Sequence, residues 1–282
     1  MSAIKKFIKG QIVEPTSMAA VDKIINSDKR LYEVWQLSRK LIPDFSDHFT
    51  TAVESREVER RIRLLIVAET DFIRSEIEEF TNKGNRCSYA DVGDSDGSVQ
   101  LLLQSYFRSD ILTTTGINLQ KSAVEKIRRK GLNAVCADAL TLHKQEGITY
   151  DLLSVFETLE HLPDPIGFLR GIRATVEGKL IVSVPFIRCS RVGMGYLSEK
   201  WPHEKTPTIE NTHIFELSPK DWTKIFMHTG WKIEREKKLM MYPASGISRL
   251  LLQPYWRYVS FEGFWFVSLQ KNDEYSSRFV IE

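Results

Sequence analysis

The chain has 282 residues, of which 42% are hydrophobic and 27% are charged, a balance typical of a globular protein with a large core. Its 39 Lys and Arg residues oppose 37 Asp and Glu residues, and the formal net charge of +2 excludes partners held mainly by charge, such as nucleic acid. Three cysteines without a Cys-x-x-Cys pair argue against a disulfide framework and a thiolate zinc site.

No apolar run approaches the roughly 18 residues that a membrane-spanning helix needs. The first residues, MSAIKKFIKGQIVEPTS, lack the continuous apolar stretch and the small-residue cleavage site of a secretion signal. We therefore expect a cytoplasmic protein without a membrane span.

The first part of the chain has a helical pattern. Apolar residues between Val58 and Phe80 recur at spacings of three, four and seven, which predicts one long amphipathic helix. Shorter helices are expected over 19–25 and 31–41, the second of them ended by Pro43. We expect residues 1–57 to form a helical extension and residues 58–282 to form the main domain.

From residue 87 onward, short apolar strands alternate with helical patterns, which predicts βαβ units and a mostly parallel sheet. Strands are expected over 87–93, 111–119, 133–139, 150–156, 179–186, 231–239 and 263–271. A helix is expected from Ser218 and Pro219 to Gly230, and a short one around 247–252. Residues from about 187 to 216 show no clear periodicity, and a connection of this length is typical of a binding loop or lid.

The segment YADVGDSDGS, residues 89–98, joins a strand to a helix through a turn with two glycines. Gly93 and Gly97 permit positive φ and a close approach of the backbone to a ligand, and the free N–H groups of the following helix can hold its polar end. The spacing is not the Gly-x-Gly-x-x-Gly of dinucleotide sites, which argues against a nicotinamide oxidoreductase. A tight turn without a ligand is the alternative interpretation.

Because four further segments follow this turn in the family's order, the chain resembles the class I S-adenosylmethionine-dependent methyltransferases of the bacterial small-molecule type. This type includes the quinone-biosynthesis methyltransferases. Five segments carry the resemblance: ADVGDSDGS, GINLQKSAVEKIRRKG, CADAL, YDLLSVFETLEHLPDP and GKLIVSVP. It implies a Rossmann-like α/β fold, a seven-stranded mostly parallel sheet with an antiparallel last strand, helices on both faces and an N-terminal helical extension.

The resemblance also implies a cofactor, S-adenosylmethionine, and the residues that bind it. Gly93 and Gly97 would pass under the methionine part, and Asp91 would hold the turn and the amino group. Asp138 and Ala139 would face the adenine, and Phe156 would lie beside the cofactor.

The chain departs from the family pattern at two positions. Ser95 takes the place of the middle glycine of the turn, and Asn118 takes the place of the acid that binds the ribose hydroxyls. An amide oxygen accepts a hydrogen bond without the charge-assisted strength of a carboxylate, so cofactor affinity is expected to be reduced.

Candidate groups for acceptor chemistry follow the fourth predicted strand, in FETLEH. His161 is the candidate general base because an imidazole titrates near neutrality, and His213 in the long loop is the second. The alternatives are a loop-fixing role for His161 and a solvated loop position for His213. We assign no metal ligand, although related quinone O-methyltransferases suggest a divalent metal at Glu157, Glu160 and His161. Trp201 and Tyr196 are candidates for stacking on a flat or sugar-like acceptor.

The acceptor class follows partly from what the sequence lacks. FETLEH stands where amino-methylating nucleic-acid enzymes carry an Asn/Asp-Pro-Pro-aromatic segment, and no Pro-Cys pair offers a nucleophile for pyrimidine carbon-5. We therefore expect methyl transfer to an oxygen or nitrogen of a small metabolite, a sugar, or a lipid-linked or glycan-precursor intermediate. The alternative is a catalytically degenerate, methyltransferase-like binding or partner protein. The oligomeric state is left open.

Overall fold

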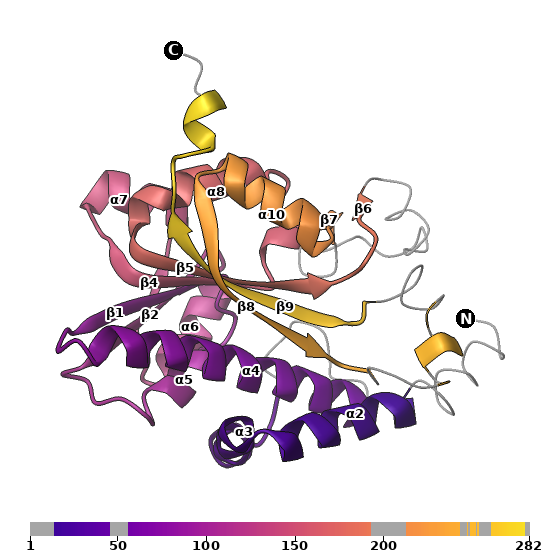
Figure 1. Ribbon diagram of the computed structural model, residues 1–282. Coiled ribbons are helices and arrows are strands. Elements are labelled where there is room, and N and C mark those ends of the chain that lie inside the picture. The colour runs from indigo at the N-terminus through magenta and orange to yellow at the C-terminus, as the bar shows by residue number, and fades with distance from the viewer. Residues whose placement is uncertain are drawn as a thin grey trace.

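Seven strands form one sheet in the order β3-β2-β1-β4-β5-β9-β8 in the computed structural model, with helices on both faces (Figure 1). The structure describes residues 14–45, 56–192, 213–242, 247, 249–251, 253 and 261–279. The strands are β1 Cys87–Val92, β2 Leu112–Asn118, β3 Ala134–Cys136, β4 Tyr150–Phe156, β5 Val176–Phe186, β8 Trp231–Met240 and β9 Gly263–Lys271. The predicted seven-stranded α/β fold is confirmed.

The sheet is parallel from β3 through β5, and β9 pairs antiparallel with both β5 and β8. The predicted antiparallel last strand is therefore confirmed. Connections run outward in opposite directions from the β1–β4 pair, and ligands of open α/β sheets bind beyond the carboxyl ends of the strands at such a reversal.

One face of the sheet is covered by the N-terminal helices α2 Glu14–Ser27, α3 Lys29–Leu41 and α4 Arg56–Thr81, together with α5 Ser98–Leu103 (Figure 1). Val21, Val34 and Leu64 are fully buried in the core that these helices share with the sheet. The long helix predicted over 58–80 is confirmed. The domain boundary at residue 57 remains a prediction.

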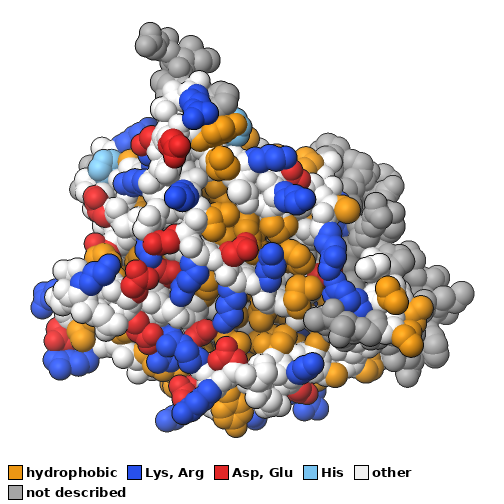
Figure 2. Space-filling model, viewed as in Figure 1, with side chains coloured by type: hydrophobic (Ala, Val, Ile, Leu, Met, Phe, Trp, Pro, Cys, Tyr) orange, Lys and Arg blue, Asp and Glu red, His pale blue; other side chains and the backbone are white. Residues whose placement is uncertain are grey.

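Ion pairs attach α4 to the sheet. The Glu76 carboxylate lies 2.9 Å from Lys179 Nζ and 2.7 Å from an Arg235 guanidinium nitrogen, and Glu76 is only 2% exposed. Asp71 pairs in addition with Lys237 at 3.2 Å. On this face of the molecule, basic and acidic side chains are interspersed (Figure 2).

The opposite face is covered by α7 Ala139–Glu146, α8 Pro165–Gly171 and α10 Pro219–His228 (Figure 1), while α6 Lys121–Arg129 packs against β2 and β3. Short 3-10 helices lie at η2 Leu159–His161, η3 Ile172–Thr175 and η5 Ser276–Phe279. The bulky side chains of Trp222, Phe226 and Trp265 fill the core on this side. No described helix is long and apolar enough to cross a bilayer.

Two local expectations were wrong. The third strand was predicted over 133–139 but ends at Cys136, because the Asp138 carboxylate accepts the backbone N–H of Leu140 and begins helix α7, which was not predicted. The loop predicted over about 187–216 also contains two short paired strands, β6 Arg191–Val192 and β7 Phe215–Glu216. Within the short helix predicted around 247–252, residues 247 and 249–251 are helical.

Candidate active site

A cavity of about 560 Å³ lies beyond the carboxyl ends of β1, β2 and β4. Most of the predicted site residues line it: Asp91, Gly93, Ser95, Asn118, Asp138, Ala139, Phe156 and His161. Gly97 and His213 are not among the lining residues. The structure therefore brings predicted residues from four separate segments to one cavity, at the reversal point of the sheet.

The glycine turn adopts the conformation that its residue types allow. Gly93 and Gly97 have φ angles of 89° and 76°, a region that side chains other than glycine disfavour. A Cβ atom on Gly93 would lie 2.5 Å from Thr158 Oγ1, so the turn also packs closely against the residues that follow β4. Ser95 also lines the cavity.

Two acids of the turn, Asp94 and Asp96, hold its shape, and neither was singled out in the sequence. The Asp94 carboxylate accepts hydrogen bonds from Gly97 N (2.6 Å), Asp96 N (3.2 Å) and Gln100 Nε2 (2.6 Å). Asp96 accepts from Ser98 N at 3.0 Å and pairs with Lys130 Nζ at 3.0 Å. Asp94 and Asp96 stand four and two residues before the first residue of α5. An Asp that accepts from backbone N–H groups two or three residues further on is a recognisable turn signal that could have identified them.

Asp91 lies deep in the cavity and is 6% exposed. Ser154 Oγ donates a 2.6 Å hydrogen bond to its carboxylate. Burial raises the pKa of Asp91 well above its ordinary value, and the neighbouring Asp94 charge adds to the shift. A cation in the cavity would compensate this cost.

Asn118 is engaged by the protein on both sides of its amide. Its Nδ2 donates to the Asp94 carbonyl oxygen at 2.8 Å, and its Oδ1 accepts from Gln120 N at 2.8 Å. The amide therefore links the end of β2 to the glycine turn, a contact that a carboxylate could not make because it has no donor.

Beyond the end of β4 the backbone is strained. Glu157 has a φ of 44° and is the one non-glycine residue with positive φ in the described part of the chain. Burial is the main cause that raises the pKa of Glu157 well above its ordinary value, and repulsion from Glu160 and Glu69 raises it further. Its N–H donates to both the carbonyl oxygen and Oγ of Ser183, each at 3.1 Å.

Glu160 and two histidines form a second cluster. Glu160 is 0% exposed, and neither of its carboxylate oxygens receives a hydrogen bond from an N–H or hydroxyl group of the described residues. His161 Nε2 lies 3.9 Å from the Glu160 carboxylate, and the His161 and His213 rings meet edge to face with centroids 4.7 Å apart. The ligand atoms of all three residues lie within 4.8 Å of one another. Two imidazoles and a carboxylate are a suitable donor set for a divalent metal ion.

His213 is brought to this cluster by the returning end of the long loop. Ile214 N donates to the Glu160 carbonyl oxygen at 2.7 Å, and His213 Nδ1 lies 2.9 Å from Glu216 Oε1. A carboxylate on one ring nitrogen fixes the orientation of an imidazole and directs its other nitrogen. The stacking candidates Trp201 and Tyr196 lie outside the described residues.

Glu69 of helix α4 is a further cavity residue that the sequence did not reveal. It is 5% exposed, and its Oε1 accepts a 3.1 Å hydrogen bond from Ser183 Oγ. Burial raises the pKa of Glu69 to about 8. An acid within a long amphipathic helix gives no sequence signal that separates a buried position like this one from a solvated one.

The chemistry of the cavity fits the cofactor implied by the resemblance. S-adenosylmethionine carries a sulfonium cation and an ammonium group, and Asp91, Glu69 and Glu157 present buried carboxyl groups whose pKa values are raised chiefly by burial. Asp138, at the start of α7, lies on the same cavity wall with Ala139 and offers an acceptor for an exocyclic amine.

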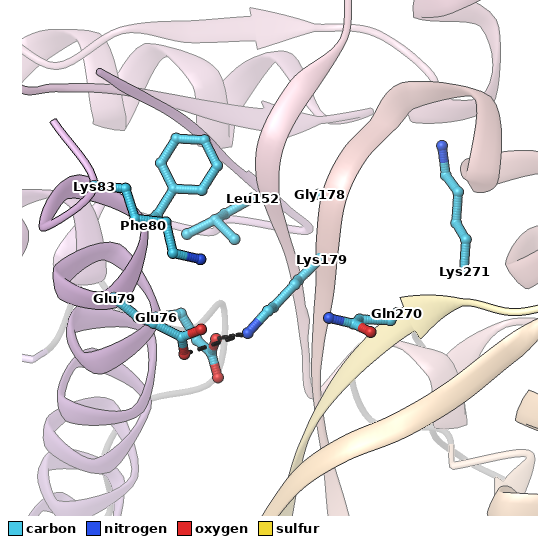
Figure 3. Close-up of a pocket in the computed structure, with 9 residues that line it drawn as sticks. All are labelled: Glu76, Glu79, Phe80, Lys83, Leu152, Gly178, Lys179, Gln270 and Lys271. Atoms are coloured by element: carbon cyan, nitrogen blue, oxygen red, sulfur yellow. Dashed lines mark hydrogen bonds and ion pairs between the residues drawn. The ribbon is translucent and has the colours of Figure 1, made fainter. Parts of the chain in front are cut away.

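A second, smaller pocket of about 290 Å³ lies at the opposite end of the sheet, between α4 and the beginnings of β4 and β5. Figure 3 shows Lys179 extending from the sheet toward Glu76 and Glu79 of α4. Because these charges are paired with one another, the pocket has the character of a structural ion-pair site.

Comparisons with known proteins agree with this architecture. Residues 55–236 match the family model described as a methyltransferase domain. No curated protein matches the chain by sequence.

Several solved structures share the fold. Magnesium protoporphyrin IX methyltransferase from Synechocystis PCC 6803, with bound S-adenosylhomocysteine, is 14% identical with a TM-score of 0.50, over 86% of this chain and 94% of that chain. The O-methyltransferase of a trans-AT PKS multienzyme of Brevibacillus brevis, also with S-adenosyl-L-homocysteine, is 13% identical with a TM-score of 0.51, over 86% and 82%. The CurJ carbon methyltransferase is 13% identical with a TM-score of 0.54, over 95% and 70%. At these identities the likeness shows a common fold.

Proposed function

This chain belongs to the methyltransferase domain family, for which S-adenosylmethionine is the methyl donor, and from that premise we propose that it methylates an oxygen or nitrogen of a small metabolite, a sugar or a lipid-linked intermediate. One observation carries the proposal: the glycine turn at Gly93 and the imidazole of His161 line the same cavity. This arrangement supports a methyl-donor site and a proton acceptor in one cavity.

The residues divide the work of an in-line displacement. When bound, the sulfonium cofactor supplies an electrophilic methyl group. Asp91 and the turn beginning at Gly93 would orient it, while Asn118 holds the turn in place. His161 would accept the proton of the acceptor's hydroxyl or amine, and His213, oriented by Glu216, is the second candidate base.

The cluster of Glu160, His161 and His213 supports a second version of the proposal, in which these residues hold a divalent cation and the two histidines act as metal ligands instead of bases. Burying a carboxylate that receives no hydrogen bond from an N–H or hydroxyl group of the described residues is costly, and a cation between this acid and two imidazoles would reduce the cost. Such an ion lowers the pKa of a bound hydroxyl, so this version favours an oxygen as the methylated atom.

A degenerate methyltransferase-like binding protein remains the second candidate, because Ser95 and Asn118 replace the family's glycine and acid in the cavity wall. Turnover separates the two. The purified chain should be incubated with S-adenosylmethionine and panels of phenols, sugars and amines, with and without Mg²⁺ or Mn²⁺, while release of S-adenosylhomocysteine is followed.

We expect release with at least one oxygen acceptor, and its loss in His161→Ala. His228→Ala is the matched control, because His228 lies on α10 and packs against Tyr275 away from the cavity. S-adenosylhomocysteine binding without turnover by any acceptor would support the degenerate alternative instead.

A further inference from the structure

We propose that Glu69 of helix α4 is a positioning residue of the methyl-transfer site, acting through Ser183 on the backbone of Glu157. This inference rests on the proposed function. Glu69 and Ser183 are separated by 114 positions in the sequence, and each is almost completely buried, with exposed fractions of 5% and 0%. The contact between them is therefore largely shielded from bulk solvent.

The hydrogen bonds run in one direction. Glu157 N donates to Ser183 Oγ at 3.1 Å, and Ser183 Oγ donates to Glu69 Oε1 at 3.1 Å. A serine hydroxyl has a single proton, so the acceptor at Glu69 determines where that proton points and leaves a lone pair facing the Glu157 N–H. Without the acceptor, the hydroxyl is free to turn its proton toward the same N–H.

Glu157 needs such support because its backbone is strained. Its φ of 44° is sterically unfavourable for a residue with a side chain and persists only where the surroundings impose it. The imposed conformation directs the chain from the end of β4 into Thr158, which packs against Gly93 of the cofactor turn, and then into Glu160 and His161. Relaxation at Glu157 would therefore shift both halves of the cavity.

The position of Glu69 on helix α4 has a second consequence. Helix α4 continues the N-terminal helices, so the Glu69–Ser183 hydrogen bond connects that layer directly to the reaction site. We infer that the N-terminal helices contribute to the geometry of the cavity as well as to the core.

Two substitutions at position 69 separate positioning from folding. Glu69→Gln keeps an oxygen acceptor for Ser183, whereas Glu69→Leu keeps similar bulk and removes it. Calorimetric titration of the full chain with S-adenosylhomocysteine should give affinities within about twofold of wild type for Glu69→Gln and about tenfold weaker for Glu69→Leu. Glu76→Gln is the matched control, a buried acid of the same helix that pairs with Lys179 away from the cavity, and its affinity should be unchanged.

A double-mutant cycle completes the test. Ser183→Ala should weaken binding about as much as Glu69→Leu, and combining the two should add little, because both remove the same contact. Additive losses, or wild-type affinity in Glu69→Leu, would overturn the inference. Absence of S-adenosylhomocysteine binding by the wild-type chain would instead overturn the proposed function, so the two failures are distinguishable. Thermal unfolding of each variant shows whether it is folded.

Discussion

The glycine turn and the segment that follows β4 differ in how their polar side chains are hydrogen-bonded. In the glycine turn, Asp94 receives three hydrogen bonds and Asp96 is paired with Lys130, so the turn is held entirely by the protein. Beyond β4, Glu157 is strained, and within the described ranges no N–H or hydroxyl group donates a hydrogen bond to the Glu160 carboxylate.

This difference suggests different roles for the two regions. A turn whose polar side chains are satisfied can hold the cofactor through backbone groups without reorganising. A buried carboxylate without a partner is unstable by itself, and a site keeps it where a ligand supplies the missing partner. We therefore propose that the turn holds the cofactor and that the cluster beyond β4 activates the acceptor.

The largest expected effect comes from replacing Glu160, because this removes the buried carboxylate that distinguishes the segment beyond β4 from the glycine turn. Glu160→Leu should abolish binding of Mn²⁺ and lower the rate of methyl transfer by on the order of 100-fold. Its free energy of unfolding should not fall, because the substitution removes a buried carboxylate that receives no hydrogen bond from an N–H or hydroxyl group of the described residues. Calorimetry with Mn²⁺ and chemical denaturation measure the two effects. Loss of stability with unchanged Mn²⁺ binding would show that Glu160 is a structural residue.

The second effect is a dependence of the free energy of unfolding on pH, caused by Glu69. The pKa of Glu69 is about 8 in the folded protein against 4.5 as its ordinary value, so between these pH values the unfolded chain releases a proton that the folded chain keeps. The Glu69 contribution to the free energy of unfolding therefore falls as pH rises from 4.5 to about 8 and is constant above.

Glu69→Gln should remove this decline, so the variant should gain stability over wild type by a few kcal/mol near pH 8 relative to pH 5. Denaturant unfolding across that range measures it. Parallel curves for the two proteins would mean that Glu69 is ionised when folded.

The third effect concerns the glycine turn, whose acids are hydrogen-bonded by the protein itself. Asp94→Ala leaves the N–H groups of Gly97 and Asp96 and the amide of Gln100 without their acceptor, so stability should fall by about 2 kcal/mol. Affinity for S-adenosylhomocysteine should fall with it. The exposed Asp110→Ala is a control that should change neither. Unchanged affinity in a destabilised variant would show that the turn's shape is not required for binding.

The smallest effect sharpens the comparison at Asn118. Asn118→Asp restores the acid that the family resemblance implies at this position, but it also removes the donor to the Asp94 carbonyl oxygen and places a charge beside it. We expect affinity for S-adenosylhomocysteine to fall by about threefold, in proportion to one lost hydrogen bond. A gain in affinity would mean that ribose recognition outweighs the turn's internal contact.

Much of the fold could be predicted because its signals are local. The strand and helix periodicities located all seven strands and the long helix α4, and four of the five ordered motifs contribute residues to the cavity wall. The prediction missed α7, although Asp138 at its start and Gly147 at its end are recognisable caps. Its eight residues are too few to show a clear periodicity after a three-residue strand.

The acceptor side could be predicted only in part. Glu160 and His161 stand together in one motif, but His213 reaches them through the backbone hydrogen bond from Ile214 to Glu160, a contact between distant segments. Glu69 depends on how α4 packs over Ser183, and helix periodicity carries no information about which strand residue lies beneath an acid.

The most direct test of the whole account is calorimetric titration of the full chain with S-adenosylhomocysteine, first in EDTA and then with Mn²⁺ added. The account predicts micromolar binding in both conditions, because the turn is complete without a metal, and separate Mn²⁺ binding that disappears in Glu160→Leu. Absence of binding in both conditions would contradict the assignment of the cavity as the cofactor site.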